Sequence, residues 1–182
     1  FGATKGSENF IDVDLAGLGG TNAFTRFVLG SGWYIPAPFK TTLHLQGKLG
    51  YVRQNSWGEL PSYEKFYLGG INSMRGFKFG SVSPIDPETG DRIGGEKMMH
   101  FNFEIIFPLI PSAGVKGVVF FDAGNVWTKD QGYDITNLRQ SVGGGIRWYS
   151  PVGPIRLEYG YIVRGEEGDG DGGWEFTIGS VF

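Results

Sequence analysis

The sequence predicts an all-β fold, an antiparallel transmembrane β-barrel of about eight strands. Apolar and polar residues alternate with a period of two over most of the chain, as in strands that have one apolar face. The chain contains 32 glycines and 15% aromatic residues, a composition that favours strands and bends. No run of about 18 apolar residues could cross a bilayer as a helix, so a membrane protein of this sequence would cross with strands. The length of 182 residues indicates a single domain over residues 1–182.

Eight segments carry the alternation. It is clearest in Thr41–Gln54, Glu96–Pro108, Gly153–Val163 and Gly173–Phe182. It is weaker in Asn9–Leu18, Asn22–Pro36, Val115–Trp127 and Arg139–Ser150. Many of these segments have about 10 residues, the length that a tilted strand needs to cross a bilayer. The face that we expect to contact lipid includes Leu43, Leu45, Phe101, Phe103, Ile105, Leu157 and Tyr159.

The connections alternate between two kinds. Short or proline-marked turns are Pro36–Pro38, Pro108–Gly114 and Ser150–Pro154, whereas longer polar connections are Gln54–Gly95, Thr128–Asn137 and Arg164–Gly172. Short periplasmic turns at one rim and long extracellular loops at the other are typical of bacterial outer-membrane barrels. An even number of strands places both termini on the short-turn side.

A soluble β-sandwich or lipocalin-like barrel explains the alternation equally well, because a period of two does not say which face meets lipid. The opposite face favours the membrane barrel, since it combines charges of both signs with small residues that suit an enclosed lumen. The charged positions are Asp12, Asp14, Arg26, Lys48, Glu104, Lys116, Asp122, Arg147, Arg156 and Glu158, and the small ones include Gly143, Gly145 and Gly160.

One long loop, residues 54–95, interrupts the series of strands. Its segment Phe66–Phe79 reads FYLGGINSMRGFKF, which is too aromatic for a disordered linker. We expect its aromatic side chains, Phe66, Tyr67, Phe77 and Phe79, to be buried. Arg75 is the only cation in the middle of this segment, and Gly76 beside it allows a close approach of the backbone. The segment therefore predicts a loop that packs into the barrel and brings Arg75 to a buried acidic partner.

Composition and motifs argue against several functions. A net charge of −3 without a Lys/Arg stripe gives no indication of nucleic-acid binding, and the absence of cysteine excludes thiol catalysis. No signal peptide begins the chain. His44 and His100 face inward and are expected to be hydrogen-bonded rather than metal-bound. The acidic residues Glu166, Glu167, Asp169 and Asp171 match no calcium loop. Ala123 follows Asp122 where an aspartic protease has a hydroxyl residue, so we expect no catalytic residue, cofactor or metal.

Several motifs together resemble the BamA family of outer-membrane protein assembly factors, specifically the C-terminal half of its barrel. They are YLGGINSMRGF at 67–77, FFDAGNVW at 120–127, WYSPVGPIRLEYG at 148–160 and the terminal strand that ends in Phe182. The motifs occur in family order and cover essentially the whole chain. The wider family includes two-partner-secretion transporters and chloroplast and mitochondrial counterparts.

The resemblance implies two sites. The family's loop motif is Val-Arg-Gly-Phe, which here reads Met74-Arg75-Gly76-Phe77. In the family this loop lies in the lumen, and its arginine meets acidic residues on the next two strands, by position Glu104 and Asp122 here. Arg75, Gly76, Phe77, Glu104 and Asp122 would then join the loop to the barrel wall. The family's terminal strand is an assembly signal, carried here by Phe176, Ile178, Gly179 and Phe182 and interrupted by Ser180.

The resemblance also implies a function: folding and insertion of other outer-membrane proteins in a Gram-negative bacterium, with no bond made or broken. The implied partners are the lipid bilayer, unfolded clients and assembly-complex subunits. The alternative is a small passive or structural barrel or pore without assembly activity. Family members have a sixteen-stranded barrel behind POTRA domains, and this chain shows neither those domains nor the first barrel half, as a fragment would.

Closure of the barrel leaves two alternatives. The interior of an eight-stranded barrel is filled by its own side chains, with little room for an inward loop. Either the loop is expelled and the chain closes alone, which is the alternative we favour, or two copies pair edge to edge as a homodimer.

Overall fold

The computed structural model describes residues 2–17, 19–150 and 153–179, and eight strands make up most of this part. They are β1 (Gly6–Ala16), β2 (Phe24–Ala37), β3 (Thr41–Gln54), β4 (Lys97–Ile110), β5 (Val115–Trp127), β6 (Arg139–Ser150), β7 (Gly153–Arg164) and β8 (Gly172–Ile178). Within the described residues, no helix is long and apolar enough to cross a membrane. The expected all-β fold with about eight antiparallel strands is confirmed.

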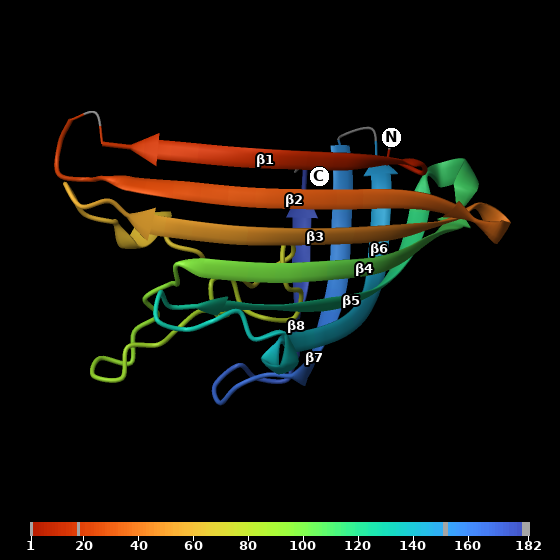
Figure 1. Ribbon diagram of the computed structural model, residues 1–182. Coiled ribbons are helices and arrows are strands. Elements are labelled where there is room, and N and C mark those ends of the chain that lie inside the picture. The colour runs from red at the N-terminus through yellow and green to blue at the C-terminus, as the bar shows by residue number, and fades with distance from the viewer. Residues whose placement is uncertain (1, 18, 151–152, 180–182) are drawn as a thin grey trace.

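The described strands form one antiparallel sheet in chain order, β1 to β8. The register places His44 of β3 opposite Glu104 of β4, and Arg147 of β6 opposite Arg156 of β7. The strands β6 to β8 run steeply across the direction of β1 to β5, so the sheet curves around the yellow-green long loop (Figure 1). This curvature gives the sheet an inner and an outer face.

The connections differ at the two ends of the sheet, as the sequence predicts. Single 3₁₀ turns at Pro38–Lys40 and Pro111–Ala113 join β2 to β3 and β4 to β5. At the other end, residues 55–96 join β3 to β4 and residues 128–138 join β5 to β6. We call these two ends the short-turn rim and the long-loop rim.

The outer face is apolar and the inner face is polar. On β4, Phe101 and Phe103 point outward and are 44% and 37% exposed, whereas Asn102 and Glu104, which alternate with them, are buried. A soluble sandwich would bury the aromatic face and leave the charged one in water. The observed arrangement is the reverse, which suits a sheet whose outer face meets lipid.

The long loop provides much of the apolar core. Its buried side chains pack against the inner wall near the long-loop rim, in a cluster of Phe24, Val52, Phe66, Leu68, Met74, Phe77, Val82, Met98, Val126 and Ile162. Burial of Phe66 and Phe77 agrees with the sequence prediction, and Tyr67 is half-buried. The prediction for Phe79 is wrong, because this side chain is 93% exposed. Met74 and Phe77 already fill the wall side of the loop, and Phe79 lies with exposed Lys78 at a turn that ends at Gly80, where φ is 72° and after which the chain is buried again.

The sheet is open in the part of the chain that the structure describes: β1 pairs with β2 alone and β8 with β7 alone. The expectation that the chain closes by itself and expels the loop is therefore not met. The physical reason is the occupied interior. Residues 66–82 of the loop fill the concave side, which an eight-stranded barrel would need for its own side chains.

Candidate functional site: the luminal loop and the inner wall

The loop backbone approaches the wall most closely at two glycines, Gly76 of the loop and Gly160 of β7. A Cβ atom on Gly160 would lie 2.5 Å from the Gly76 nitrogen, and one on Gly76 would lie 2.7 Å from the Gly160 carbonyl oxygen. Gly76 also has a φ of 89°, in the left-handed region that favours glycine. Both positions therefore require glycine if the loop is to lie against β7.

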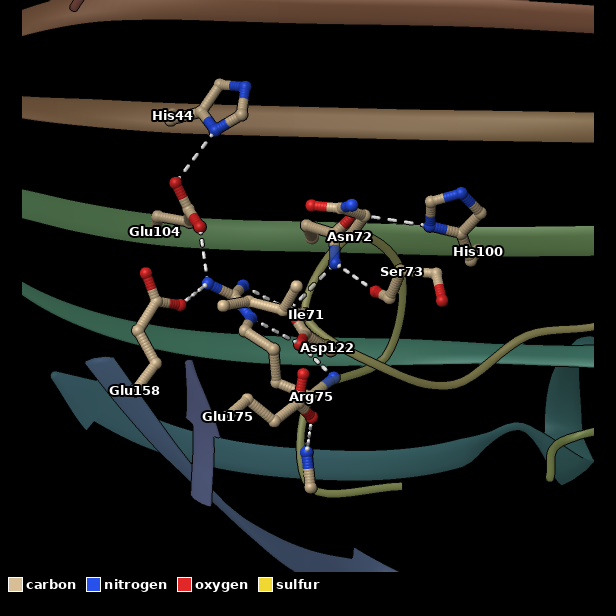
Figure 2. Close-up of polar contacts among 12 residues, drawn as sticks. His44, Ile71, Asn72, Ser73, Arg75, His100, Glu104, Asp122, Glu158 and Glu175 are labelled. Atoms are coloured by element: carbon tan, nitrogen blue, oxygen red, sulfur yellow. Dashed lines mark hydrogen bonds and ion pairs between the residues drawn. The ribbon is translucent and has the colours of Figure 1, made fainter. Parts of the chain in front are cut away.

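Arg75 is 2% exposed and bonds carboxylates from three strands (Figure 2). Its Nε donates to Asp122 Oδ2 of β5 at 2.8 Å, and its Nη2 donates to Asp122 Oδ1 at 2.6 Å. Its Nη1 donates to Glu104 Oε1 of β4 at 2.6 Å and to Glu158 Oε2 of β7 at 2.8 Å. The guanidinium also lies 3.6 Å from the centre of the Phe120 ring. The planar fork of donors is what allows one side chain to hold three strands.

Two wall arginines balance the remaining negative charge. Arg147 Nε donates to Glu158 Oε1 at 2.7 Å, and Arg147 Nη2 donates to Glu104 Oε1 at 2.6 Å. Arg156 Nε donates to Glu158 Oε1 at 3.0 Å. With Arg75 and Asp122, these residues form what we call the central cluster, three arginines and three carboxylates that are all buried. A buried charge is tolerated when it is paired and hydrogen-bonded, and this cluster meets both conditions.

Further hydrogen bonds hold the loop backbone around Arg75. The Ser73 carbonyl accepts from Asn102 Nδ2 at 2.7 Å, and the Ile71 carbonyl accepts from Arg156 Nη2 at 3.2 Å. The Gly76 N–H donates to Glu175 Oε1 of β8 at 2.8 Å. Around Arg75 the loop thus forms hydrogen bonds with four strands of the inner wall: β4, β5, β7 and β8.

A second ionic group lies at the long-loop rim, which we call the rim cluster. Arg139 at the start of β6 pairs with Glu166 and, at 3.5 Å, with Asp169, both in the connection between β7 and β8. Asp169 also faces Arg92 of the long loop at 3.7 Å. Arg139 Nη1 donates to the Ser81 carbonyl at 3.2 Å. These contacts join two loops to the end of one strand.

The structure brings Arg75, Gly76, Phe77, Glu104 and Asp122 together at one place on the wall. Sequence reasoning placed Glu158, Arg147 and Arg156 on the inner face without assigning them to this site, and it did not single out Glu175. The signal that would have found them is the strand register, which sets Arg147 directly opposite Arg156 and which the alternation alone does not give. Two like charges across a strand pair are unfavourable unless carboxylates lie between them.

The predicted terminal-strand residues fall in and beyond β8. Phe176 and Ile178 point outward and are 60% and 56% exposed. Gly179 follows the strand with a φ of 71°. Phe182 and the interrupting Ser180 lie outside the described residues.

The two inward histidines have protein partners. His44 Nδ1 lies 3.0 Å from Glu104 Oε2, and its ring stacks on Tyr34 with 4.2 Å between centres. His100 Nδ1 lies 3.2 Å from Asn102 Oδ1. Among the described residues, no three histidine, aspartate or glutamate side chains come together as a metal-binding group.

Comparison with known proteins identifies the family. Residues 1–182 match the Omp85 superfamily domain. The chain belongs to the Omp85 superfamily. An outer membrane protein assembly factor BamA from Nitratidesulfovibrio vulgaris is 36% identical over 184 residues, covering 98% of this chain and 23% of that protein. BamA from Neisseria meningitidis is 28% identical, covering 98% of this chain and 26% of that protein. A SAM50-like protein of Drosophila melanogaster is 28% identical over 93% of this chain.

A solved Omp85 structure has the same fold. The crystal structure of BamA from Haemophilus ducreyi lacking POTRA domains 1-3 superimposes with a TM-score of 0.84 at 29% identity, covering 98% of this chain and 39% of that one. The chain thus spans about a quarter of the curated BamA relatives named above. The expected fold, an antiparallel transmembrane barrel sheet, is confirmed by this likeness.

Proposed function

We propose that this chain is barrel wall from an assembly factor of the BamA type, and that it assists the folding and insertion of other outer-membrane proteins. The observation that carries the proposal is the docked loop, in which Arg75 is 2% exposed and bonded to three wall carboxylates. The chain is also 36% identical, over 98% of its own residues, to a protein named as an assembly factor. We propose the outer membrane of a Gram-negative bacterium as its location.

The geometry supports a physical route for assistance that breaks no covalent bond and needs no enzyme chemistry. In the described residues, the outer edge of β8 has no neighbouring strand. Unpaired backbone N–H and C=O groups are costly in lipid, so this edge favours pairing with an incoming strand. The central cluster meanwhile fixes the wall behind it. A weak seam at such an edge, with local thinning of the bilayer, would lower the barrier to insertion.

The proposed partners follow from the same surfaces. The outer apolar face contacts the bilayer, the free edge accepts unfolded outer-membrane clients, and the remaining subunits of an assembly complex bind elsewhere on the complete protein. A homodimer, in which β1 of one copy pairs with β8 of the other, is a second way to satisfy both edges. The detergent-corrected mass of the purified chain distinguishes one copy from two.

Insertion into vesicles tests the proposal. The chain is reconstituted alone, and also as a chimera in which it replaces the matching segment of the Nitratidesulfovibrio vulgaris relative. An unfolded client barrel is added, and its folding is followed by protease protection. We expect the chimera to insert the client faster than empty vesicles do, and Arg75→Ala in the chimera to reduce the rate. A chimera no faster than empty vesicles would contradict the proposal and leave the passive barrel or pore.

A further inference from the structure

The loop motif contacts the last described strand through one side chain. Glu175 lies on the inner face of β8, and its Oε1 accepts the Gly76 N–H at 2.8 Å (Figure 2). Arg75, the preceding residue, bonds β4, β5 and β7. Adjacent residues of the loop therefore join the wall of the barrel to the strand at its edge.

The sheet itself holds β8 less firmly than the other strands. With seven residues, β8 is the shortest strand of the described chain, and its backbone pairs with β7 alone. Its register also sets Glu175 directly opposite Glu158 of β7. Like charges across a strand pair repel, and Glu158 already takes Arg75, Arg147 and Arg156 as partners. The Gly76 N–H is the hydrogen-bond donor that the Glu175 carboxylate finds on this face.

The backbone around this contact is built for close approach. Gly160 of β7 would place a Cβ atom 2.5 Å from the Gly76 nitrogen, and Gly173 of β8 would place one 4.0 Å from the Gly76 oxygen. The loop backbone can therefore approach the β7–β8 hairpin this closely only because Gly76 and Gly160 have no side chain. Moving the loop removes the hydrogen bond to Glu175 at the same time.

We propose that Glu175 is a positioning residue that couples the luminal loop to the edge strand. While its carboxylate accepts the Gly76 N–H, β8 is held against β7 and the wall. When the loop leaves the wall, β8 loosens along the edge where a client strand would pair. The last step rests on the proposed function, whereas the coupling between loop and strand does not.

Spin labels measure the coupling without any client. The chain has no cysteine, so a single cysteine takes a nitroxide cleanly. One label replaces Phe176, on the outer face of β8, and a second, in a separate protein, replaces the outward Phe121 of β5 as a control. In vesicles, Glu175→Leu should narrow the lines of the electron paramagnetic resonance spectrum of the label at position 176, because that label becomes more mobile. The spectrum of the label at position 121 should stay unchanged. Glu175→Gln should stay close to the parent, because its amide oxygen still accepts the Gly76 N–H.

Amide exchange gives an independent measure. In Glu175→Leu, the Gly76 N–H should exchange at least about tenfold faster, as expected when a hydrogen bond to a charged acceptor is lost. Asp12→Leu is the matched control, since Asp12 is an exposed carboxylate on the other edge strand, β1. It should change neither the label at 176 nor the exchange at Gly76.

A double variant separates coupling from simple destabilisation. Arg75→Ala should also mobilise the label at 176, although the wall contacts of the Arg75 side chain lie on β4, β5 and β7. If Glu175 transmits the effect, Arg75→Ala added to Glu175→Leu should cause no further mobility at 176. Additive effects, or an unchanged label in Glu175→Leu, would overturn the inference. Should Arg75→Ala fail to fold, the Glu175→Leu and Glu175→Gln pair still decides it.

The result can be told apart from a failure of the proposed function. Mobile β8 in Glu175→Leu together with an inactive chimera would keep the coupling and reject the assembly role. An active chimera in which Glu175→Leu leaves the label, the exchange rate and the insertion rate unchanged would keep the assembly role and reject the coupling.

Discussion

The central cluster and the rim cluster both hold loops to strands with arginine–carboxylate pairs, but they differ in burial and geometry. The contacts of Arg75 in the central cluster are 2.6–2.8 Å long, and its carboxylate partners are at most 5% exposed. At the rim, the contacts to Asp169 are 3.5 and 3.7 Å long, and the Glu166 side chain is 53% exposed. The same residue types thus make a buried, fully bonded contact in one place. At the rim, Arg139 and Asp169 are also buried, but their contact is longer and the second carboxylate, Glu166, is half in water.

The difference shows which part of the loop is fixed. Breaking a buried, balanced set of charges leaves uncompensated charge without water, whereas water replaces the partner at an exposed pair. The motif at residues 74–77 should therefore keep its position while the outer loops move. The following changes test this contrast, beginning with the largest expected effect.

Arg75→Ala should lower the free energy of unfolding by about 3–5 kcal/mol, because Glu104, Asp122 and Glu158 lose a shared partner in a buried site. Arg75→Lys should cost nearly as much, since an ammonium cannot reproduce the planar fork. Denaturant unfolding in vesicles measures both. If either variant unfolds like the parent, the central cluster does not hold the loop.

Glu158→Gln should cost about 2–3 kcal/mol, because it leaves Arg147 and Arg156 opposite each other with one less carboxylate. Adding Arg147→Met should recover part of the loss by restoring the charge balance. The same unfolding experiment with both variants forms the test. If the double variant loses more unfolding free energy than the two single variants lose together, charge balance is not the cause.

Arg139→Ala should cost less, about 1–2 kcal/mol, because its partner Glu166 is half in water, although its second partner Asp169 is buried. The change should nevertheless raise proteolytic cleavage in the connection between β7 and β8, which Arg139 fixes at the rim. Limited proteolysis in vesicles, set beside Arg75→Ala, compares the two regions directly. A cost equal to that of Arg75→Ala would remove the contrast between the clusters.

Salt should have the smallest effect and should act on the rim alone. At 1 M ionic strength the screening length falls to about 3 Å, which weakens exposed pairs and spares buried ones. Amide exchange should therefore quicken around the half-exposed Glu166 and stay unchanged at Arg75. Equal responses at both positions would mean that water reaches the central cluster.

Much of the fold follows from local pattern. The alternation of Phe101 and Phe103 with Asn102 and Glu104 is a property of strand geometry, so it identifies β4 and its two faces without tertiary information. Strand ends were less well defined: β4 continues to Ile110 in the structure, two residues beyond the predicted end at Pro108. The open edges could not be predicted in this way, because they depend on how much space the loop occupies inside the sheet.

The site was predicted in part. Arg75, Glu104 and Asp122 came from a resemblance in motifs, whereas Glu158 and Glu175 contribute through register and loop path, which no local pattern encodes. Phe79 is a second residue whose position the local pattern does not predict. Its aromatic character favours burial, but the path of the chain after Phe77 places it in the open.

The directions of the two edge strands limit the number of strands that can complete the wall. In the described chain β1 runs from the short-turn rim to the long-loop rim, and β8 runs back. Whatever completes the wall must meet both edges antiparallel, and only an even number of added strands can do so. A barrel with this wall therefore grows or shrinks by whole hairpins, and a second copy of the same sheet satisfies the parity as well as a different one does.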